Sequence, residues 1–310
     1  MGVLVASQRP FPPPPAPVPW PGVARSTWTA DGQEPIDLLN PASHGVMLVQ
    51  DGVRGLGMPP VKRYTSTSPA VHGSRWRGHQ VEEREVMWPL FVWSDAGTAD
   101  WLERDAALWR SFRPDVEGWW EFATSNAVRR LRCRFSDDSD HSFSADPSRR
   151  GWDLYGVRMV AEDPWWHGAS VHVEWGQGST DPFLPGPPFT IGGASDMGTA
   201  TLRNPGDVPA WPVWSIPGPS AGATVGLAGR TVSVPFAIAA DEVLVVDTRP
   251  SQMTAMAYSS SGAVVDRTGS LGPSTFAPVP PGTAANLSLS VDGGGPVRAT
   301  LDPLYYRAWG

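Results

Sequence analysis

Two stretches decide the fold: RRLRCRF at residues 129–135 and YGVRMVA at residues 155–161. In the first, apolar residues alternate with arginines, and in the second tyrosine, valine, methionine and alanine stand at every second position. Because successive side chains of a strand point to opposite faces, this period of two predicts strands with one buried face. Two such strands on either side of one connection predict an antiparallel pair. The connection, residues 136–151, is polar and longer than an ordinary hairpin loop, so we expect it to project from the domain.

The period changes in the segment before these strands, at residues 94–112. Five large apolar residues fall there on one helical stripe, and charged residues fall elsewhere: Trp101, Leu102, Leu108, Trp109 and Phe112. We expect one amphipathic helix, with Ser94, Asp95 or Thr98 as N-cap and an end before Pro114. No other segment predicts a helix with comparable strength.

The rest of the chain consists of short apolar runs between turn signals. Before the helix these runs predict strands at residues 36–39, 46–49 and 86–93. Past residue 200 they predict an antiparallel sandwich with strands at 211–216, 231–238, 243–247, 287–291 and 297–301. The fold class is therefore mainly β, with a barrel-like or sandwich N-terminal domain that carries the helix and a C-terminal antiparallel β-sandwich.

Composition agrees with this class and excludes several functions. The 310 residues include 33 Gly and 34 Pro, which interrupt helices, and 16 Trp, which supply material for a core. A net charge of −7 argues against a protein that mainly coats nucleic acid or anionic membrane. The single cysteine, Cys133, excludes an intrachain disulfide. The first residues lack a secretory signal, and no stretch approaches 18 apolar residues, so we expect a soluble protein assembled in a reducing cytoplasm.

Four segments are expected along the chain. Residues 1–22 form a proline-rich extended arm, because eight of the twelve residues from 10 to 21 are proline. Residues 23–176 form the N-terminal domain. Residues 177–198 are a linker rich in glycine and proline, and residues 199–310 form the C-terminal sandwich.

One string has the spacing of a hydrolase nucleophile: GPSAG at residues 218–222, with Ser220 at its centre. That motif needs a helix after the serine and a histidine further along the chain. The last histidine is His172, and residues 223–227 have the character of a strand. We therefore interpret Ser220 as a turn residue and expect no enzyme and no catalytic residue.

Two groups of side chains have the chemistry of metal ligands. The segment DDSDH at residues 137–141 offers carboxylates and an imidazole, but it lacks the terminal glutamate and the flanking helices of a calcium-binding loop. His167 and His172 lie five residues apart, which is neither strand nor helix spacing for a ligand pair. We expect a solvated loop tip, ordinary histidines, and no metal or cofactor.

The nearest approach to a nucleic-acid face is a group of arginines beside two tryptophans: Arg129, Arg130, Arg132, Arg134, Trp119 and Trp120. Such arginines could bind phosphate, or they could pair with acids on a neighbouring strand, such as Glu82, Glu83 and Glu85. The acidic net charge favours ion pairs or a solvated face.

Tryptophans are concentrated in the N-terminal domain, where 11 of 16 lie between residues 76 and 175. Most are expected in the core, because tryptophan is highly buried on average. Exposed tryptophans on a sandwich would instead suit a carbohydrate-binding or adhesin module, in which Trp211, Trp214 or Trp309 binds sugar.

Several short strings occur in a characteristic order around the helix: GLGMPPV (55–61), REVMWPL (84–90), AEDPWW (161–166), NPGDVPAWPVW (204–214), DTRP (247–250) and VPPGT (279–283). Together they resemble the distal tail proteins of long-tailed phages that infect actinobacteria, also described as minor tail or phage tail domain proteins. The resemblance covers residues 23–310, and the proline-rich arm departs from it.

The resemblance implies a structural virion protein without an active site. It implies an N-terminal belt domain and a galectin-like C-terminal sandwich, with six copies forming a ring at the distal end of the tail tube. The implied partners are further copies of the chain, the tail tube protein, the tape-measure protein, the tail hub and receptor-binding proteins. DNA is implied only as cargo passing through the ring, and membrane not at all. A sugar-binding module of the tail tip is the alternative.

Overall fold

The computed structural model describes residues 23–40, 45–49, 51–138, 146–175, 201–293 and 295–310. The chain forms two compact units, one of residues 1–166 with 306–310 and one of residues 167–305. The first unit thus ends ten residues before the expected bound at 176, and the last five residues of the chain belong to it. The expected arm and linker lie outside the described residues.

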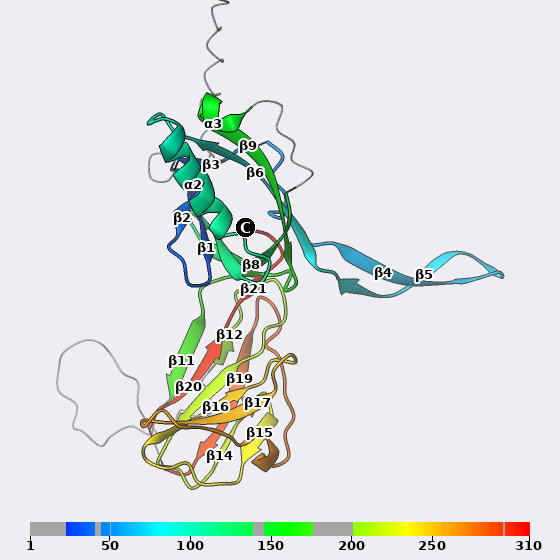
Figure 1. Cartoon of the computed structure of the whole chain (residues 1–310). Coiled ribbons are helices and arrows are strands. Elements are labelled where there is room, and N and C mark those ends of the chain that lie inside the picture. The colour runs from blue at the N-terminus through cyan, green and yellow to red at the C-terminus, as the bar shows by residue number, and fades with distance from the viewer. Residues whose placement is uncertain (1–22, 41–44, 50, 139–145, 176–200, 294) are drawn as a thin grey trace, which may run out of the picture. The chain divides into compact units, whose positions relative to one another are not determined.

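The first unit is built on a strongly curved antiparallel sheet (Figure 1). Its strands follow the order β2-β1-β7-β8-β9-β6-β3. Their bounds are β1 Val23–Ala30, β2 Ile36–Asp37, β3 Val46–Leu48, β6 Arg84–Trp93, β7 Glu117–Thr124, β8 Val128–Asp137 and β9 Trp152–Ala161. The end strands approach one another, since Leu48 N donates to Leu38 O over 2.8 Å, so the sheet is nearly a closed barrel.

The predicted antiparallel pair is confirmed as β8 and β9, with Arg134 opposite Val160 and Phe135 opposite Met159. Leu131 and Cys133 are buried on β8, and the alternating Arg130, Arg132 and Arg134 lie outward. Of the connection, residues 139–145 lie outside the described part. Its last residues form a four-residue helix that was not expected, α3 (Pro147–Arg150).

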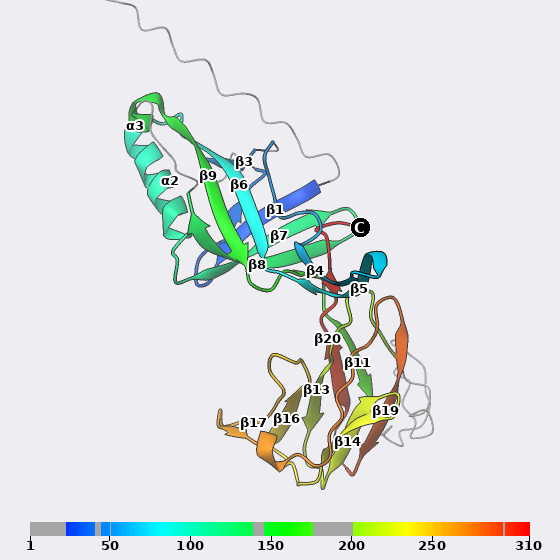
Figure 2. The ribbon, with the colours of Figure 1, turned by 90° about the vertical axis from the view of Figure 1, so that its right-hand side faces the viewer.

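The predicted helix is confirmed as α2 (Thr98–Arg110), with two corrections. Its N-cap is Gly97, whose φ of 106° favours glycine, and no side chain caps the helix. Leu102 is 50% exposed, so only part of the predicted stripe is buried. In Figure 2 the helix lies along one side of the curved sheet.

Aromatic rings fill the space between helix and sheet. Trp88 contacts Trp28 and Trp120 edge-on, with ring centroids 5.4 and 4.9 Å away. Trp28 stacks on Phe112 just after the helix, at 5.8 Å, and its indole N–H donates to Ser111 Oγ over 3.1 Å. The expectation that most tryptophans are core residues therefore holds for this group, because each large ring buries area and finds an edge-to-face partner.

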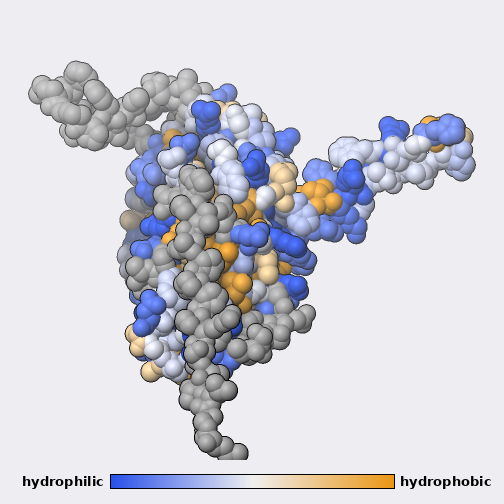
Figure 3. Space-filling view, turned by 90° about the horizontal axis from the view of Figure 1, so that it is seen from above, coloured by the Kyte–Doolittle hydropathy of each residue, from blue (hydrophilic) through white to orange (hydrophobic). Residues whose placement is uncertain are grey.

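A two-stranded hairpin, β4 (Val61–Ser68) and β5 (Val71–Val81), forms a separate sheet of the first unit. It extends away from the curved sheet (Figures 1 and 3). Nearly all of its residues are exposed. The sequence analysis did not anticipate it.

The second unit is the predicted antiparallel sandwich. One sheet has the order β11-β20-β13-β16-β17-β18 and the other β12-β19-β14-β15. Their bounds are β11 Val171–Trp175, β12 Thr201–Arg203, β13 Val213–Pro217, β14 Ala223–Leu227, β15 Arg230–Val234, β16 Glu242–Asp247, β17 Thr254–Ser259, β18 Val264–Asp266, β19 Ala284–Val291 and β20 Val297–Leu301. Trp214, Ile216, Val225, Leu244 and Leu301 are buried between the sheets.

The chain passes between the units twice, in β10 (Trp166–His167) and after β21 (Leu304–Tyr305). A short 3₁₀ helix, η1 (Thr268–Ser270), follows β18. Among the described residues, no helix has the length and apolar character needed to cross a membrane.

Candidate interaction surfaces

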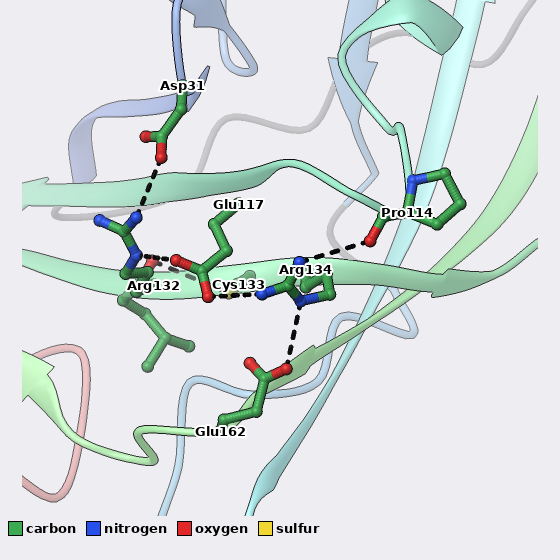
Figure 4. Close-up of polar contacts among 8 residues, drawn as sticks. Asp31, Pro114, Glu117, Arg132, Cys133, Arg134 and Glu162 are labelled. Atoms are coloured by element: carbon green, nitrogen blue, oxygen red, sulfur yellow. Dashed lines mark hydrogen bonds and ion pairs between the residues drawn. The ribbon is translucent and has the colours of Figure 1, made fainter.

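The arginines of β8 form ion pairs on the outer face of the curved sheet (Figure 4). Glu117 on β7 lies between Arg132 and Arg134, with its carboxylate paired to Arg132 Nε and, at 2.7 Å, to Arg134 Nη2. Arg132 also reaches Asp31 at 2.9 Å, and Arg134 reaches Glu162 at 3.3 Å. The predicted ion pairs are present, but the acids come from other elements than the predicted Glu82, Glu83 and Glu85.

These contacts leave little cationic surface on β8 for phosphate. The hydrogen bond from Arg132 is the largest cause that lowers the pKa of Glu117, and Arg134 adds to it. Arg130 lies over the Trp119 ring at 5.2 Å, and Arg129 is buried, with Nη1 donating to Arg307 O over 2.7 Å. A nucleic-acid face built on this strand is therefore not supported.

Arg84, at the start of β6, is buried and binds backbone carbonyls from several segments. Its guanidinium donates to Gly55 O, Pro164 O and Tyr306 O, each over 2.8 Å, and to Gly57 O over 2.5 Å. Burial lowers the pKa of Arg84 to about 10, so the group stays charged at neutral pH. Three of the strings that carry the resemblance, at residues 55–61, 84–90 and 161–166, thus meet at one side chain.

Asn204 has the same role in the second unit. Its side chain is buried, donates to Val208 O over 2.8 Å and Val279 O over 3.0 Å, and accepts from Gly206 N over 2.8 Å. The strings at residues 204–214 and 279–283 therefore meet at Asn204. In both units these strings hold loops in place, and none of these contacts forms an open site for a substrate.

Ser220 follows the bend at Gly218 and Pro219, forms an antiparallel β-bridge with Ile238, and precedes β14. Its hydroxyl donates to Gly222 O over 2.9 Å, and the residue is buried. The strand predicted at residues 223–227 is confirmed, so the helix that a nucleophile elbow requires does not follow the serine.

In the part of the chain that the structure describes, no three histidine, cysteine or acidic side chains lie close enough together to hold a metal ion. Asp137 lies 3.7 Å from Arg158, and most of the predicted DDSDH segment is outside the described residues. His167 lies in β10 and His172 in β11. Burial raises the pKa of the Cys133 thiol, which makes this cysteine a poor nucleophile.

The expected sugar platform is not formed by the three tryptophans proposed for it. Trp214 is buried in the sandwich core. Trp309 belongs to the first unit, where its ring lies 5.5 Å from Phe122, because the last five residues leave the sandwich. Trp211 alone lies half-buried on the second unit. The carbohydrate alternative thus loses two of the three residues on which it depended, Trp214 and Trp309.

The surface that sequence reasoning missed is the β4–β5 hairpin. Of twelve large apolar side chains exposed in the described residues, four lie on it: Val61, Tyr64, Val71 and Trp76. Neither face of the hairpin is buried, so its sequence lacks the apolar alternation that predicts a strand. Its charge could have revealed it, since residues 61–81 contain four basic and no acidic side chains.

The structure therefore defines a class: a barrel-like β unit with one long helix and a projecting hairpin, joined to an antiparallel β-sandwich. Searches against protein-family models and curated proteins give no match.

Among solved structures, the chain is similar to the Dit (gp 19.1) protein of phage SPP1, described as a paradigm of the hub adsorption apparatus in phages that infect Gram-positive bacteria. The TM-score is 0.62 at 15% identity, over 90% of this chain and 98% of that one. It is also similar to a chain of the phage P2 baseplate in its activated conformation with calcium, with a TM-score of 0.52 at 10% identity, over 89% and 97% of the two chains. The strontium form of that baseplate gives a TM-score of 0.51. At these identities the similarity shows a shared fold.

Proposed function

We propose that this chain is a structural protein of a phage virion, located at the distal end of a long tail. Six copies form a ring that joins the tail tube to the tail tip and carries the hub and receptor-binding proteins. The tape-measure protein and then the DNA pass through its channel. The first unit acts as the belt that forms the ring, and the galectin-like second unit acts as a platform.

The observation that carries this proposal is the similarity over nearly the whole chain to a phage hub protein and a phage baseplate chain. Similarity to one unit alone would be weaker support, because single β-sandwiches serve many functions. Here the similarity covers both units. The short strings of the resemblance also occur in both units, and they point to the same class independently.

The surfaces of the first unit also suit an assembly. A ring closes through heterologous contacts, in which one patch of each copy binds a different patch of the next. An exposed hairpin and, elsewhere in the unit, exposed Leu102, Val128 and Leu154 provide side chains that such contacts would cover. No catalytic role is proposed, since Ser220 and the β8 arginines are engaged in internal contacts.

The direct test is the mass of the purified chain, measured by sedimentation and native mass spectrometry, with negative-stain images of the same sample. We expect a closed oligomer of six copies with an open centre. Antibody labelling of the intact virion should then mark the distal end of the tail. A chain that stays monomeric at all concentrations, and that labels no part of the tail tip, would contradict the proposal.

A further inference from the structure

The β4–β5 hairpin lacks the packing that normally stabilises a sheet. Among the strands of the described residues, its two strands pair only with each other and form a sheet of their own. An isolated two-stranded hairpin is marginally stable in water, because neither face is buried. Trp76 is 63% exposed and Val71 68% exposed. These features indicate a segment that becomes covered in an assembly.

Its charge differs in sign from that of the rest of the molecule. Lys62, Arg63, Arg75 and Arg77 give residues 61–81 a formal charge of +4, and no acid opposes them there. The rest of the chain has 20 basic and 31 acidic side chains, a charge of −11. Within the described residues, none of the four hairpin cations is in an ion pair.

The contacts along the hairpin separate its two faces. Lys62 lies over the Tyr64 ring at 5.8 Å, and Arg77 Nε donates to Ser66 Oγ over 2.9 Å on that same face. On the other face the Trp76 ring stacks on His79 at 6.2 Å. One face thus carries Lys62, Tyr64 and Arg75, and the opposite face carries Trp76 with Arg63, which pairs with His79. Cations and exposed aromatic rings therefore lie on both faces.

An acidic edge lies in the same unit, where β6 begins and β9 ends. Arg84 of β6 pairs with Ala161 of β9, so the residues beside each lie close together. Five exposed acids gather there: Glu82, Glu83, Glu85, Glu162 and Asp163. In the part of the chain that is described, Glu82, Glu83 and Glu85 have no ion pair, although they were expected to pair with β8.

We propose that the β4–β5 hairpin of one copy docks on the acidic edge of a second copy, with Arg75 and Arg77 facing Glu82 and Glu83. This contact rests on the proposed ring, to which it assigns the two complementary patches. An 11-residue strand extends roughly 35 Å. A unit of this size has a radius of gyration of about 15 Å, so the hairpin is long enough to reach across the edge of an adjacent copy.

The test uses two full-length charge-reversal variants, R75E/R77E and E82R/E83R. Each places like charges at the two pairs of residues that are proposed to face one another, so each alone should assemble at least tenfold more weakly than the unchanged chain in sedimentation at low salt. An equimolar mixture should restore the oligomer, because the glutamates at 75 and 77 of one variant meet the arginines at 82 and 83 of the other. R203E/R230E is the matched control: it makes the same charge change at two exposed arginines of the second unit and should assemble normally.

Circular dichroism and thermal unfolding will check that both variants fold like the unchanged chain. We expect them to do so, because all four substituted residues are exposed. If R75E/R77E assembles like the unchanged chain, or if the mixture stays dissociated, the inference is wrong while the ring proposal stands. An unchanged chain that never assembles contradicts the ring itself.

A nucleic-acid ligand is the rival outcome, because a basic two-stranded ribbon also fits the major groove of DNA. It would appear as binding of a 30-base-pair duplex, followed by fluorescence anisotropy, that R75E/R77E abolishes while assembly is unaffected. That result would overturn docking between copies.

Discussion

Arg84 holds several segments of the first unit together through hydrogen bonds to their backbone carbonyls. A buried guanidinium is costly unless its N–H groups are satisfied, and four carbonyl groups satisfy it here. Lysine could not replace it, because an ammonium lacks the planar fork that reaches several acceptors at once. The residue therefore fixes where two loops and the C-terminal segment lie.

Glu117 is a different case, a partly exposed carboxylate between two arginines. Its lowered pKa means that the ion pairs stabilise the fold above the pKa of the unfolded chain, and that this contribution is lost as the pH falls through the lowered, folded-state pKa. Because the group is near the surface, solvent screening keeps the effect small.

We predict that E117Q lowers the free energy of unfolding by about 0.5 to 1 kcal/mol at pH 7. The difference from the unchanged chain should shrink as the pH falls below 4.5, the ordinary pKa of a glutamate, and it should be lost as the pH falls through the lowered pKa of Glu117 in the folded protein. Denaturant titrations across this range would measure it. E103Q, which removes an exposed carboxylate without an ion pair in the described residues, should follow the unchanged chain throughout; a parallel loss in both variants would argue against the ion pairs.

Among the elements, helix α2 shows that an apolar residue on the predicted helical stripe is not necessarily buried. Leu102 and Leu108 both fall on the predicted stripe, yet Leu102 is 50% exposed and Leu108 only 1%. The sheet covers the helix along a narrower band than the sequence pattern suggested. Which apolar residue meets the core depends on how the helix is rotated over the aromatic cluster.

We predict that L108A destabilises the protein by about 2 to 4 kcal/mol, since it leaves a cavity beside the aromatic core. L102A, the same chemical change on the same helix, should stay within about 0.5 kcal/mol. Denaturant unfolding of the two variants side by side measures the contrast. Equal losses would place Leu102 in a buried contact and contradict the observed rotation.

The β4–β5 hairpin differs from helix α2, because contacts within its own chain barely stabilise it. Sequence patterns detect strands through burial of alternate residues, and here neither face is buried within the chain. Only the charge of residues 61–81 distinguishes it. Elements whose stability comes from a partner are difficult to predict from a single sequence for this reason.

At the scale of the whole molecule, the chain behaves as two units, each with its own core and its own buried polar residue. Arg84 holds the loops of the first unit and Asn204 those of the second. If the units unfold cooperatively but separately, substitutions at these residues should affect different parts of the unfolding curve.

We predict that R84A and N204A shift different transitions in calorimetry. R84A leaves four carbonyls without their donor and should cost the first unit about 3 kcal/mol or more, or roughly 6 to 12 °C. N204A should lower the transition of the second unit by a comparable amount. A single transition shifted equally by both variants would contradict two separate units.

Local periodicity in the sequence is enough to predict several features of the fold. These are the β8–β9 pair, helix α2 and most strands of the sandwich. In each of them one face is buried in a core, so apolar residues recur with the period of the strand or helix. The sequence also indicated ion pairs for the β8 arginines, which are confirmed for Arg132 and Arg134. The spacing and order of the short strings pointed to the class of fold that the solved structures share.

Which distant residues meet depends on how the chain packs in three dimensions. The partners of the arginines are Glu117, Asp31 and Glu162, because strand order rather than sequence proximity sets the neighbours of β8. Trp309 leaves the sandwich for the first unit, and Arg84 collects carbonyls from residues as distant as Tyr306. Contacts between segments so far apart depend on how the whole chain packs, and local patterns carry no record of them.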